Sequence, residues 1–550
     1  MSQSVEIDSV GSEAIAAPKV AMRRTALVGE RGVILALAAL VVFGFGLRLN
    51  GVSYLGFAED EVNKVNAVRA YAHGDIRPNA EHPMLMKSLM FVSMWAEQAW
   101  NSRSANQISD EMALRFPNIL LGALTVIPLF LLTAAFFDRW TGLLAAALWA
   151  FGINAITYNR IAKEDTLFVF FMLYAFYFYV RAKQASWNEP KIKRRNYILS
   201  GTSFGLMLAS KYFLQYFGLN MLYHHYFRVR KPEASEPSGK TPWYFYALVA
   251  LAFLIANPAV LFPQTWAYLN AWTSEQFLTH SGYLMGDQIY KNTVSSTPFW
   301  GTPVYFYLLF LLIKVPLPVL VAFICGLVVC VRRWRHPGHA FLLLMFLLWI
   351  VPYSLFGGKW LRYTLSLMPF VYMIAAVGIV ALVRRASTFF KAANAERALR
   401  FACALALLFF IAWPAWTAYA NHPHYAAYTN VLGGNRVGYF FPHDEFYDDG
   451  LREAIEFVCE TAPPGATIVH ETPGVVAYYL EKFGRNDLQP RVLSDASFKI
   501  ADAPAPTYII LQRGRTYFEN QEKMKEVRAR FRKVYEGFVQ EVASVEVYTQ

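Results

Sequence analysis

The chain has 550 residues, of which 56% are hydrophobic and only 16% are charged. Soluble domains carry about 25% charged residues, so this composition excludes an ordinary soluble protein and indicates one that crosses a membrane several times. The net charge of +12 lies mostly in short loops between apolar segments, which indicates membrane orientation and not nucleic-acid binding.

The N-terminal region predicts an uncleaved signal anchor. Residues 1–30 lack hydrophobic periodicity and are expected to form a disordered cytoplasmic tail. Arg23, Arg24 and Arg31 flank the apolar run Gly32–Leu49, which is long enough for a helix to cross a bilayer. No small-residue cleavage site follows this run, so we expect the helix to remain, with the N-terminus in the cytoplasm.

Residues 31–420 alternate apolar segments with charged loops and predict a polytopic α-helical membrane domain of about eleven transmembrane helices. The basic loop 181–195 falls on the cytoplasmic side of this scheme, as the positive-inside rule requires. Two external loops, 51–112 and 263–300, are expected, and the amphipathic stretch Pro83–Trp100 is expected to lie on the membrane surface. The expected spans are 32–49, 113–137, 141–158, 166–181, 197–209, 212–228, 243–261, 302–331, 340–356, 364–383 and 399–418.

Residues 421–550 change in character and predict a small α/β domain outside the membrane. Turn signals such as Pro463-Pro464-Gly465 separate its elements. The expected helices are Asp448–Thr461, Gly474–Phe483 and Thr516–Phe531. The expected strands are Ala466–His470, Thr507–Leu511 and Val539–Tyr548.

Three consecutive acids, Glu59, Asp60 and Glu61, follow shortly after the first membrane helix. Acids are common in the first turn of a helix, which is the ordinary interpretation of such a triplet. The topology, however, brings further ionisable residues to the same membrane face, and such groups beside membrane spans usually mark a site. The residues at this face are Asp60, Glu61, Glu81, His82, Lys87, Arg115, Arg160, Asp165, Lys211, Lys359 and Arg362.

The chemistry of this set suits group transfer from a lipid that carries a phosphate. A carboxylate can deprotonate an acceptor hydroxyl as a general base, and Lys or Arg can neutralise a phosphate. Simpler interpretations of single residues are snorkelling to lipid head groups for Lys87, Arg115 and Lys211, an interfacial polar contact for His82, and a positive flank for Lys359 and Arg362.

Several short motifs together resemble the protein O-mannosyltransferase family, glycosyltransferase family 39, which is similar also to the transferases that add aminoarabinose to lipid A. Their order and spacing match over about residues 30–420, and His422-Pro423-His424-Tyr425 is similar to the segment after the last helix of prokaryotic members. The motifs are Asp60-Glu61, Glu81-His82-Pro83, Arg115-Phe116-Pro117, Arg160-Ile161-Ala162 with Asp165, Ser210-Lys211-Tyr212, and Arg362-Tyr363.

The resemblance implies a GT-C glycosyltransferase fold and a multi-pass enzyme of the plasma or inner membrane. It implies transfer of mannose or another hexose from a polyprenyl- or dolichyl-phosphate donor to a protein, lipid or glycan acceptor on the extracytoplasmic side. By position in the motifs, Asp60 matches the general base, Glu61 its partner in binding acceptor or donor, and Asp165 a second acidic position. The residues expected to face the donor phosphate are Arg115, Lys211 and Arg362, with Lys359 and Lys87 as further candidates. Other site candidates are Glu81, His82, Arg160 and Tyr363.

Some features leave alternatives open. Glu81 and His82 could contribute ligands to a divalent metal ion, but two adjacent residues do not define a metal site. The chain has Tyr447-Asp448-Asp449-Gly450 where the family usually has a Trp-Gly pair. A transporter or flippase for lipid-linked sugars would also need many helices and external charges, although transporters place such charges near the bilayer midplane. An oligosaccharide-transferring enzyme of the same fold is a further alternative.

Overall fold

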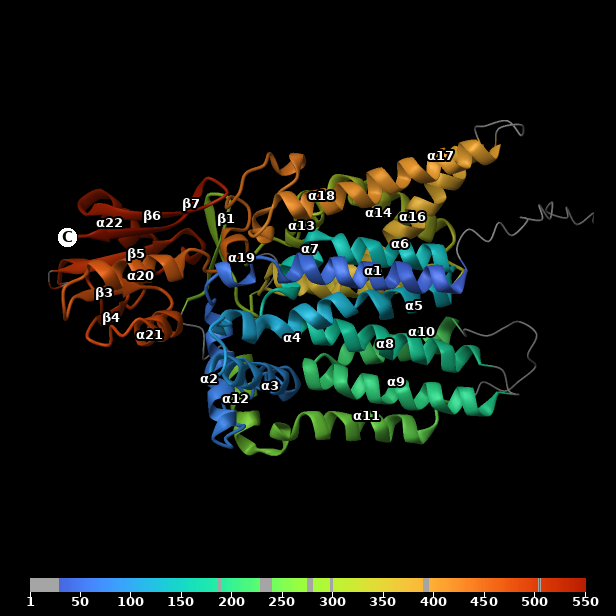
Figure 1. Cartoon of the computed structure of the whole chain (residues 1–550), viewed down its shortest axis with the longest axis horizontal. Coiled ribbons are helices and arrows are strands. Elements are labelled where there is room, and N and C mark those ends of the chain that lie inside the picture. The colour runs from blue at the N-terminus through green and yellow to red at the C-terminus, as the bar shows by residue number, and fades with distance from the viewer. Residues whose placement is uncertain are drawn as a thin grey trace, which may run out of the picture.

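The computed structural model describes residues 29–185, 189–227, 240–274, 280–296, 300–388, 395–502, 504 and 506–550. The predicted tail lies outside the described residues, except for its last two positions. Most described helices lie side by side in one bundle (Figure 1). They are α1 (Glu30–Leu49), α4 (Asp110–Leu124), α5 (Val126–Phe136), α6 (Arg139–Phe151), α7 (Ile153–Asn159), α8 (Asp165–Gln184), α9 (Pro190–Ser210), α10 (Leu214–Phe227), α11 (Trp243–Ala256), α13 (Phe306–Lys314), α14 (Leu317–Arg332), α15 (Pro337–Leu355), α16 (Met368–Thr388), α17 (Ala395–Leu407) and α18 (Trp413–Ala420).

The bundle is that of a polytopic membrane protein. Among the described residues, 6 helical segments are long and apolar enough to cross a bilayer, or 7 if the bent pair α6 and α7 forms one span. Helices α11 and α14 are apolar but shorter. The total of eleven spans stays a prediction. The expected helix 302–331 is divided into α13 and α14, because Pro316 disfavours helical conformation at the preceding Val315.

The two expected external loops contain helices of their own. Helix α2 (Glu59–Ala72) runs across the ends of the bundle helices (Figure 1), and α3 (Met84–Asn101) follows it. Helix α3 is the predicted amphipathic stretch: Met86 and Met90 are buried, whereas Trp95 is 64% exposed. The second loop contains α12 (Pro263–Thr273) and an antiparallel hairpin of β1 (Gly282–Met285) and β2 (Gln288–Lys291).

Residues after α18 form a five-stranded sheet with helices around it. The strand order is β4-β3-β5-β7-β6, with β3 parallel to β4 and β5, and β7 antiparallel to β5 and β6. The elements are α19 (Pro442–Phe446), α20 (Leu451–Thr461), β3 (Thr467–His470), α21 (Pro473–Lys482), β4 (Gln489–Val492), β5 (Thr507–Gln512), α22 (Gln521–Arg530), β6 (Arg532–Val539) and β7 (Val542–Thr549).

Some expected elements of this region were wrong in their limits. The helix expected from Thr516 begins at Gln521, and the single strand expected at Val539–Tyr548 is the end of one hairpin strand and most of the other. Gln540 and Glu541 turn this hairpin with positive φ angles of 46° and 67°. Strands β4 and β6 were not expected, because both are edge strands with many polar residues and no apolar run.

One hydrophobic cluster joins the sheet region to the membrane region. Phe57 and Val62 at the start of α2 belong to the same buried cluster as Ile455 of α20 and Tyr479 of α21. Because this apolar contact is continuous, the sheet region rests directly on α2.

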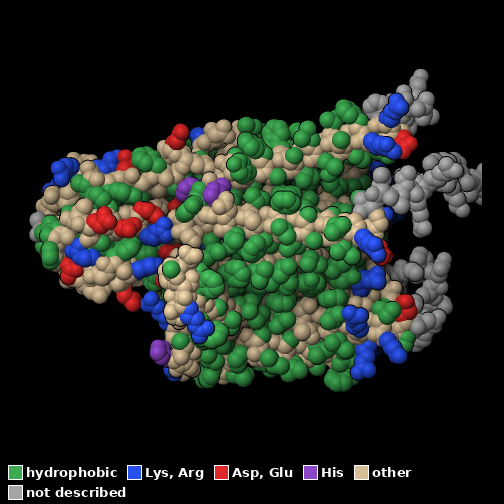
Figure 2. Space-filling view, viewed as in Figure 1, with side chains coloured by type: hydrophobic (Ala, Val, Ile, Leu, Met, Phe, Trp, Pro, Cys, Tyr) green, Lys and Arg blue, Asp and Glu red, His purple; other side chains and the backbone are tan. Residues whose placement is uncertain are grey.

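The surface divides into zones along the long axis. Figure 2 shows a broad hydrophobic band over the bundle, with charged side chains gathered at both ends. The end remote from the sheet region carries mainly Lys and Arg, whereas the sheet region carries both signs of charge (Figure 2). This distribution fits a bilayer around the bundle.

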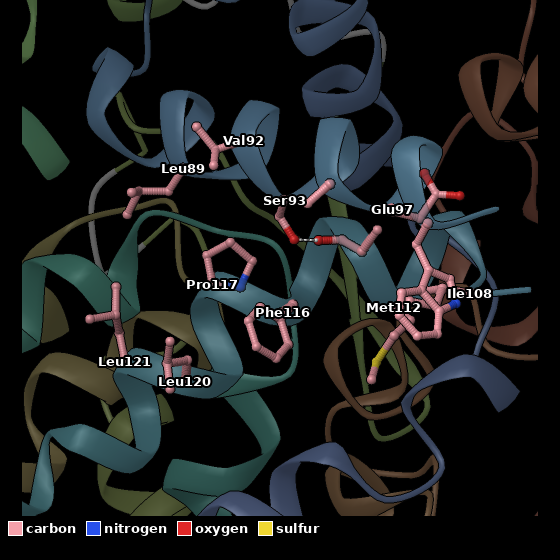
Figure 3. Close-up of a pocket in the computed structure, with 13 residues that line it drawn as sticks. Leu89, Val92, Ser93, Glu97, Ile108, Met112, Phe116, Pro117, Leu120 and Leu121 are labelled. Atoms are coloured by element: carbon pink, nitrogen blue, oxygen red, sulfur yellow. Dashed lines mark hydrogen bonds between the residues drawn. The ribbon is translucent and has the colours of Figure 1, made fainter. Parts of the chain in front are cut away.

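An apolar groove lies between α3 and α4 (Figure 3). Its volume is about 640 Å³, and Leu89, Val92 and Leu120 are among its lining residues. The Ser93 hydroxyl donates a hydrogen bond to the Ala113 carbonyl at 2.6 Å, so it does not offer a free polar group. The groove is therefore lined almost wholly by apolar side chains, with Glu97 as its one charged lining residue.

Candidate active site

The segment 52–61, which leads into α2, is held by the buried guanidinium of Arg115. Its Nε and Nη2 donate to the two carboxylate oxygens of Glu61, at 2.8 and 2.6 Å. Its remaining hydrogen bonds reach the carbonyls of Val52 and Leu55, at 2.9 and 2.7 Å, and of Gly56, at 2.6 Å. Since a guanidinium has five donors, all are used within the chain.

Glu61 completes this anchor. Its side chain also accepts hydrogen bonds from the backbone N–H groups of Ala58, at 3.0 Å, and of Ala162, at 2.8 Å. The carboxylate is buried and thus joins the start of α2 to the loop between α7 and α8. These contacts place Glu61 and Arg115 in the structure that holds the start of α2, and their expected contacts with acceptor and donor phosphate stay a prediction.

Two further ion pairs cross between α2 and the α7–α8 loop. Lys163 of the loop lies 3.0 Å from Asp60 of α2, and Lys64 of α2 lies 2.5 Å from Glu164 of the loop. Each element therefore supplies one acid and one base to the other. Glu164 is buried, and despite the burial its cationic neighbours hold its pKa well below the ordinary value.

The polar neighbours of Asp60 contact only one of its two carboxylate oxygens. Lys163, the Arg362 guanidinium and the Tyr447 hydroxyl, the last at 3.2 Å, all contact its Oδ2 atom. Within the described part of the chain, no hydrogen bond reaches Oδ1. Burial disfavours the ionised carboxyl, but Lys163 and Arg362 outweigh burial and hold the pKa of Asp60 well below its ordinary value.

A cavity of about 520 Å³ opens beside Asp60, between the membrane region and the sheet region. Its size is that of an ordinary small-molecule site. Five predicted site residues line it, namely Asp60, Glu81, His82, Arg362 and Tyr363. The cavity wall also includes Glu59, Asn63, Lys64, Asn66, Tyr268, His280, Tyr283, Asn292, Trp360, His443, Tyr447, Arg515 and Tyr517.

Asp165 and Lys211 form a pair beside the cavity wall. The Lys211 ammonium lies 2.6 Å from Asp165 and 4.7 Å from the ring centre of Tyr363. Tyr363 itself lines the cavity, next to Arg362. Lys211 is therefore separated from the cavity by one aromatic ring.

Two predicted phosphate ligands are buried and bound to backbone carbonyls. Lys87 donates to Asn79 and His82, and Lys359 donates to Thr302 and Phe356. Burial lowers the pKa of Lys87 to about 7 and that of Lys359 to about 8. Neither lines the cavity, so these contacts hold loops around it.

Arg160, Glu81 and His82 complete the predicted set. The buried guanidinium of Arg160 lies over the Tyr425 ring, 4.7 Å from its centre, and does not line the cavity. Burial, opposed by Glu164, lowers the pKa of His82 well below its ordinary value, so the ring is neutral. Among the described residues, no group of three or more His, Cys, Asp and Glu could hold a metal ion.

The sequence did not single out several residues that shape this site. Lys163 and Glu164 read as ordinary loop charges, although they adjoin the Arg160 and Asp165 motif. Lys64 stands four positions after Asp60, so it shares a helix face with it, which was the available signal. Arg515 and Tyr517 come from the sheet region, and no local pattern marks them.

The comparisons with known proteins agree with the motifs. The family model for dolichyl-phosphate-mannose-protein mannosyltransferases matches residues 98–262, which include Arg115, Arg160, Asp165 and Lys211. No curated protein matches the sequence. The solved structure of ArnT from Cupriavidus metallidurans in the apo state is similar with a TM-score of 0.51 and 13% identity, covering 94% of this chain and 97% of that chain.

Two other solved structures are more distant. The same ArnT bound to undecaprenyl phosphate has a TM-score of 0.47 and 14% identity, over 95% of this chain and 98% of that chain. The Pmt1–Pmt2 protein O-mannosyltransferase complex of S. cerevisiae, bound to its sugar donor, has a TM-score of 0.32 and 20% identity, over 46% and 39%.

Fold and hydropathy together define the class: a polytopic membrane protein whose fold is like that of ArnT. Within that class, the chain resembles the protein O-mannosyltransferases and ArnT, which confirms the resemblance that the motifs indicated.

We predict that Glu61→Ala strongly destabilises the protein, because it leaves the buried Arg115 charge without its partner. Breaking a buried pair costs about 3–5 kcal/mol. The control is Glu481→Ala, which breaks an ion pair with Arg69 whose side chains are 61% and 50% exposed, and such pairs contribute about 0–1 kcal/mol. Thermal unfolding of the purified variants measures the difference. Equal, small losses in both would contradict the anchoring position of Arg115.

Proposed function

We propose that this protein is an integral-membrane glycosyltransferase that moves a sugar from a polyprenyl- or dolichyl-phosphate lipid to an acceptor hydroxyl, with Asp60 as general base. One observation carries the proposal: the Asp60 carboxylate is fixed through Oδ2, whereas Oδ1 has no hydrogen bond within the described residues and the residue lines a cavity beside the membrane. An acceptor hydroxyl in this cavity can reach Oδ1.

The proposed step is a substitution at the anomeric carbon of the donor sugar. The acceptor oxygen forms a bond to this carbon while the bond from the carbon to the phosphate oxygen breaks. The acceptor proton passes to Asp60, and the bonding electrons leave with the polyprenyl phosphate. Negative charge therefore grows on the phosphate, where cations stabilise the transition state.

Arg362 is the cation best placed for this phosphate, and Lys211 is the second candidate. Arg362 lines the cavity beside Asp60, and Lys211 lies behind Tyr363 in the same wall. Arg115, Lys87 and Lys359 are engaged in the contacts described above, and we assign them to scaffolding.

The ion pair between Arg362 and Asp60 links donor binding to the strength of Asp60 as a base. A carboxylate with a strongly lowered pKa is a weak base, and general bases work best with a pKa near the working pH. A donor phosphate that shares Arg362 weakens its attraction to Asp60. The pKa of Asp60 would then rise when the donor is bound, which strengthens the base in the complex.

The charge distribution supports an extracytoplasmic site. The cavity lies at the end of the bundle that carries the sheet region, and the opposite end carries mainly Lys and Arg (Figures 1 and 2). Since Lys and Arg favour the cytoplasmic side, we propose a cytoplasmic N-terminus and an external active site in the plasma or inner membrane.

The comparisons support a lipid-phosphate donor. The matching family model describes dolichyl-phosphate-mannose-protein mannosyltransferases, and a structure of the similar ArnT is bound to undecaprenyl phosphate. Mannose or another hexose as the sugar, and a protein, lipid or glycan acceptor, belong to the proposal. Neither comparison supports the alternative of a transporter or flippase.

We predict that Asp60→Asn lowers turnover by about 10²–10⁴-fold, the usual share of general-base catalysis, because the amide cannot take up a proton. The assay is transfer from a defined polyprenyl-phosphate sugar by purified, folded enzyme. Asp75→Asn is the matched control, since Asp75 pairs with Arg77 on an exposed loop outside the cavity. A folded Asp60→Asn enzyme that binds donor and turns over normally would refute the role of Asp60.

We also predict that Arg362→Ala and Lys211→Ala weaken donor binding by roughly tenfold or more, because a charge-assisted hydrogen bond contributes about 1.5–3 kcal/mol. Arg69→Ala is the control, because Arg69 is a half-exposed cation outside the cavity. Donor affinity is measured directly by titration of the detergent-solubilised protein. If both variants bind donor as tightly as the control, the phosphate lies elsewhere.

A further inference from the structure

Backbone N–H groups at the start of α2 donate hydrogen bonds to side chains of the sheet region. Its N-cap residue is Ala58, whose side chain cannot accept a hydrogen bond. The Glu59 N–H donates instead to Asp448 Oδ2 at 3.1 Å, and the Phe57 N–H donates to the Tyr479 hydroxyl at 2.8 Å. Asp448, distant in sequence, therefore accepts from the Glu59 N–H, which is one of the first helix donors that have no partner within the helix.

Asp448 is fixed in place by Arg515. The Arg515 guanidinium contacts both Asp448 oxygens, with Nε at 2.7 Å from Oδ1, and Gln512 donates to the same Oδ1 at 2.9 Å. Arg515 also reaches Glu59 of α2 at 2.9 Å. Burial opposes ionisation of Asp448, but Arg515 outweighs burial and lowers its pKa. Asp448 is thus a fixed, charged acceptor over the helix start.

Tyr447, the residue before Asp448, contacts Asp60 on the same helix. Its hydroxyl donates to Asp60 Oδ2 at 3.2 Å. Tyr447 and Asp448 both have left-handed backbones, with φ angles of 44° and 63°. Such conformations cost non-glycine residues about 1–3 kcal/mol each and persist where the surrounding structure imposes them. Here they direct two adjacent side chains onto α2.

We propose that Tyr447, Asp448 and Arg515 are positioning residues, through which the sheet region holds Asp60 with its Oδ1 atom facing the cavity. This inference rests on the proposed role of Asp60 as general base. It makes the sheet region a part of the active site, because these three residues contact or orient the start of α2. Tyr447 and Asp448 lie in the stretch in which the chain departs from the usual Trp-Gly pair of the family it resembles.

The hydrogen bond from Tyr447 lowers the pKa of Asp60. The charged groups around Asp60 are Lys163 of the α7–α8 loop, Arg362 after α15, and Lys64, Glu59 and Glu61 of α2 itself. All remain when Tyr447 is changed to Phe. Loss of the hydroxyl removes one hydrogen bond to the ionised carboxyl, so the pKa of Asp60 rises. Because the base acts only when ionised, activity is then lost at a higher pH as the solution is acidified.

The first test is the pH profile of kcat at saturating donor for Tyr447→Phe, measured with full-length protein in the transfer assay, because kcat reports the pKa of the base in the donor-bound enzyme. We expect the acidic limb to move to higher pH by up to about one unit, since one hydrogen bond to a charged group is removed. We expect the donor KM to change little. A profile that superimposes on that of the parent enzyme would overturn the inference. Tyr447→Phe keeps the ring, so folding is preserved.

The second test does not depend on activity. Hydrogen–deuterium exchange over residues 57–66 is expected to be faster in Asp448→Ala, because the Glu59 N–H loses its acceptor. Asp449→Asn is the control, since Asp449 pairs with His424 instead. Unchanged exchange in Asp448→Ala contradicts the positioning inference.

The two tests separate this inference from the proposed function. An active parent enzyme with an unchanged Tyr447→Phe profile contradicts only the positioning residues. A folded parent enzyme that transfers no sugar contradicts the proposed function, and the exchange measurement then still decides whether Asp448 holds the start of α2.

Discussion

The site depends first on the buried Arg115 guanidinium and the chain that wraps around it. A buried charge is tolerated only when it is paired and its donors are satisfied. Here Glu61 supplies the charge, and the carbonyls of Val52, Leu55 and Gly56 supply the other acceptors. These bonds fix where the chain leaves the membrane and where α2 begins, and therefore where Asp60 points.

The segment 52–61 contacts the sheet region as closely as it contacts Arg115 of the bundle. A Cβ atom on Gly56 would lie 2.7 Å from the Arg452 side chain, so only glycine allows the sheet region to approach here. Arg452 in turn donates to the carbonyls of Ser53, at 3.0 Å, and Tyr54, at 2.9 Å. The segment is thus enclosed between α4 of the bundle and α20 of the sheet region.

Much of this could be predicted from the sequence, because hydropathy reduces a long chain to a few membrane faces. Charged residues far apart in sequence were assigned to one face, and Asp60, Glu81, His82, Arg362 and Tyr363 do line one cavity. A position at the same membrane face does not specify which side chains form ion pairs or hydrogen bonds with one another, however. The pairing of Arg115 with Glu61, and the binding of Lys87 and Lys359 to carbonyls, depend on side-chain directions that no local pattern encodes. Arg515 was missed for the same reason, and β4 and β6 because edge strands need no apolar run.

In the proposed complex, a lipid-phosphate sugar binds with its phosphate at Arg362, close to Lys211, and with its sugar beside Asp60. The most direct measurement is a cryo-EM structure of the Asp60→Asn protein with a bound polyprenyl-phosphate sugar. The account predicts phosphate density in contact with Arg362, close to Lys211, and the sugar in the cavity within hydrogen-bond reach of the substituted side chain. A donor whose phosphate contacts other cations, with its sugar outside this cavity, would contradict the account.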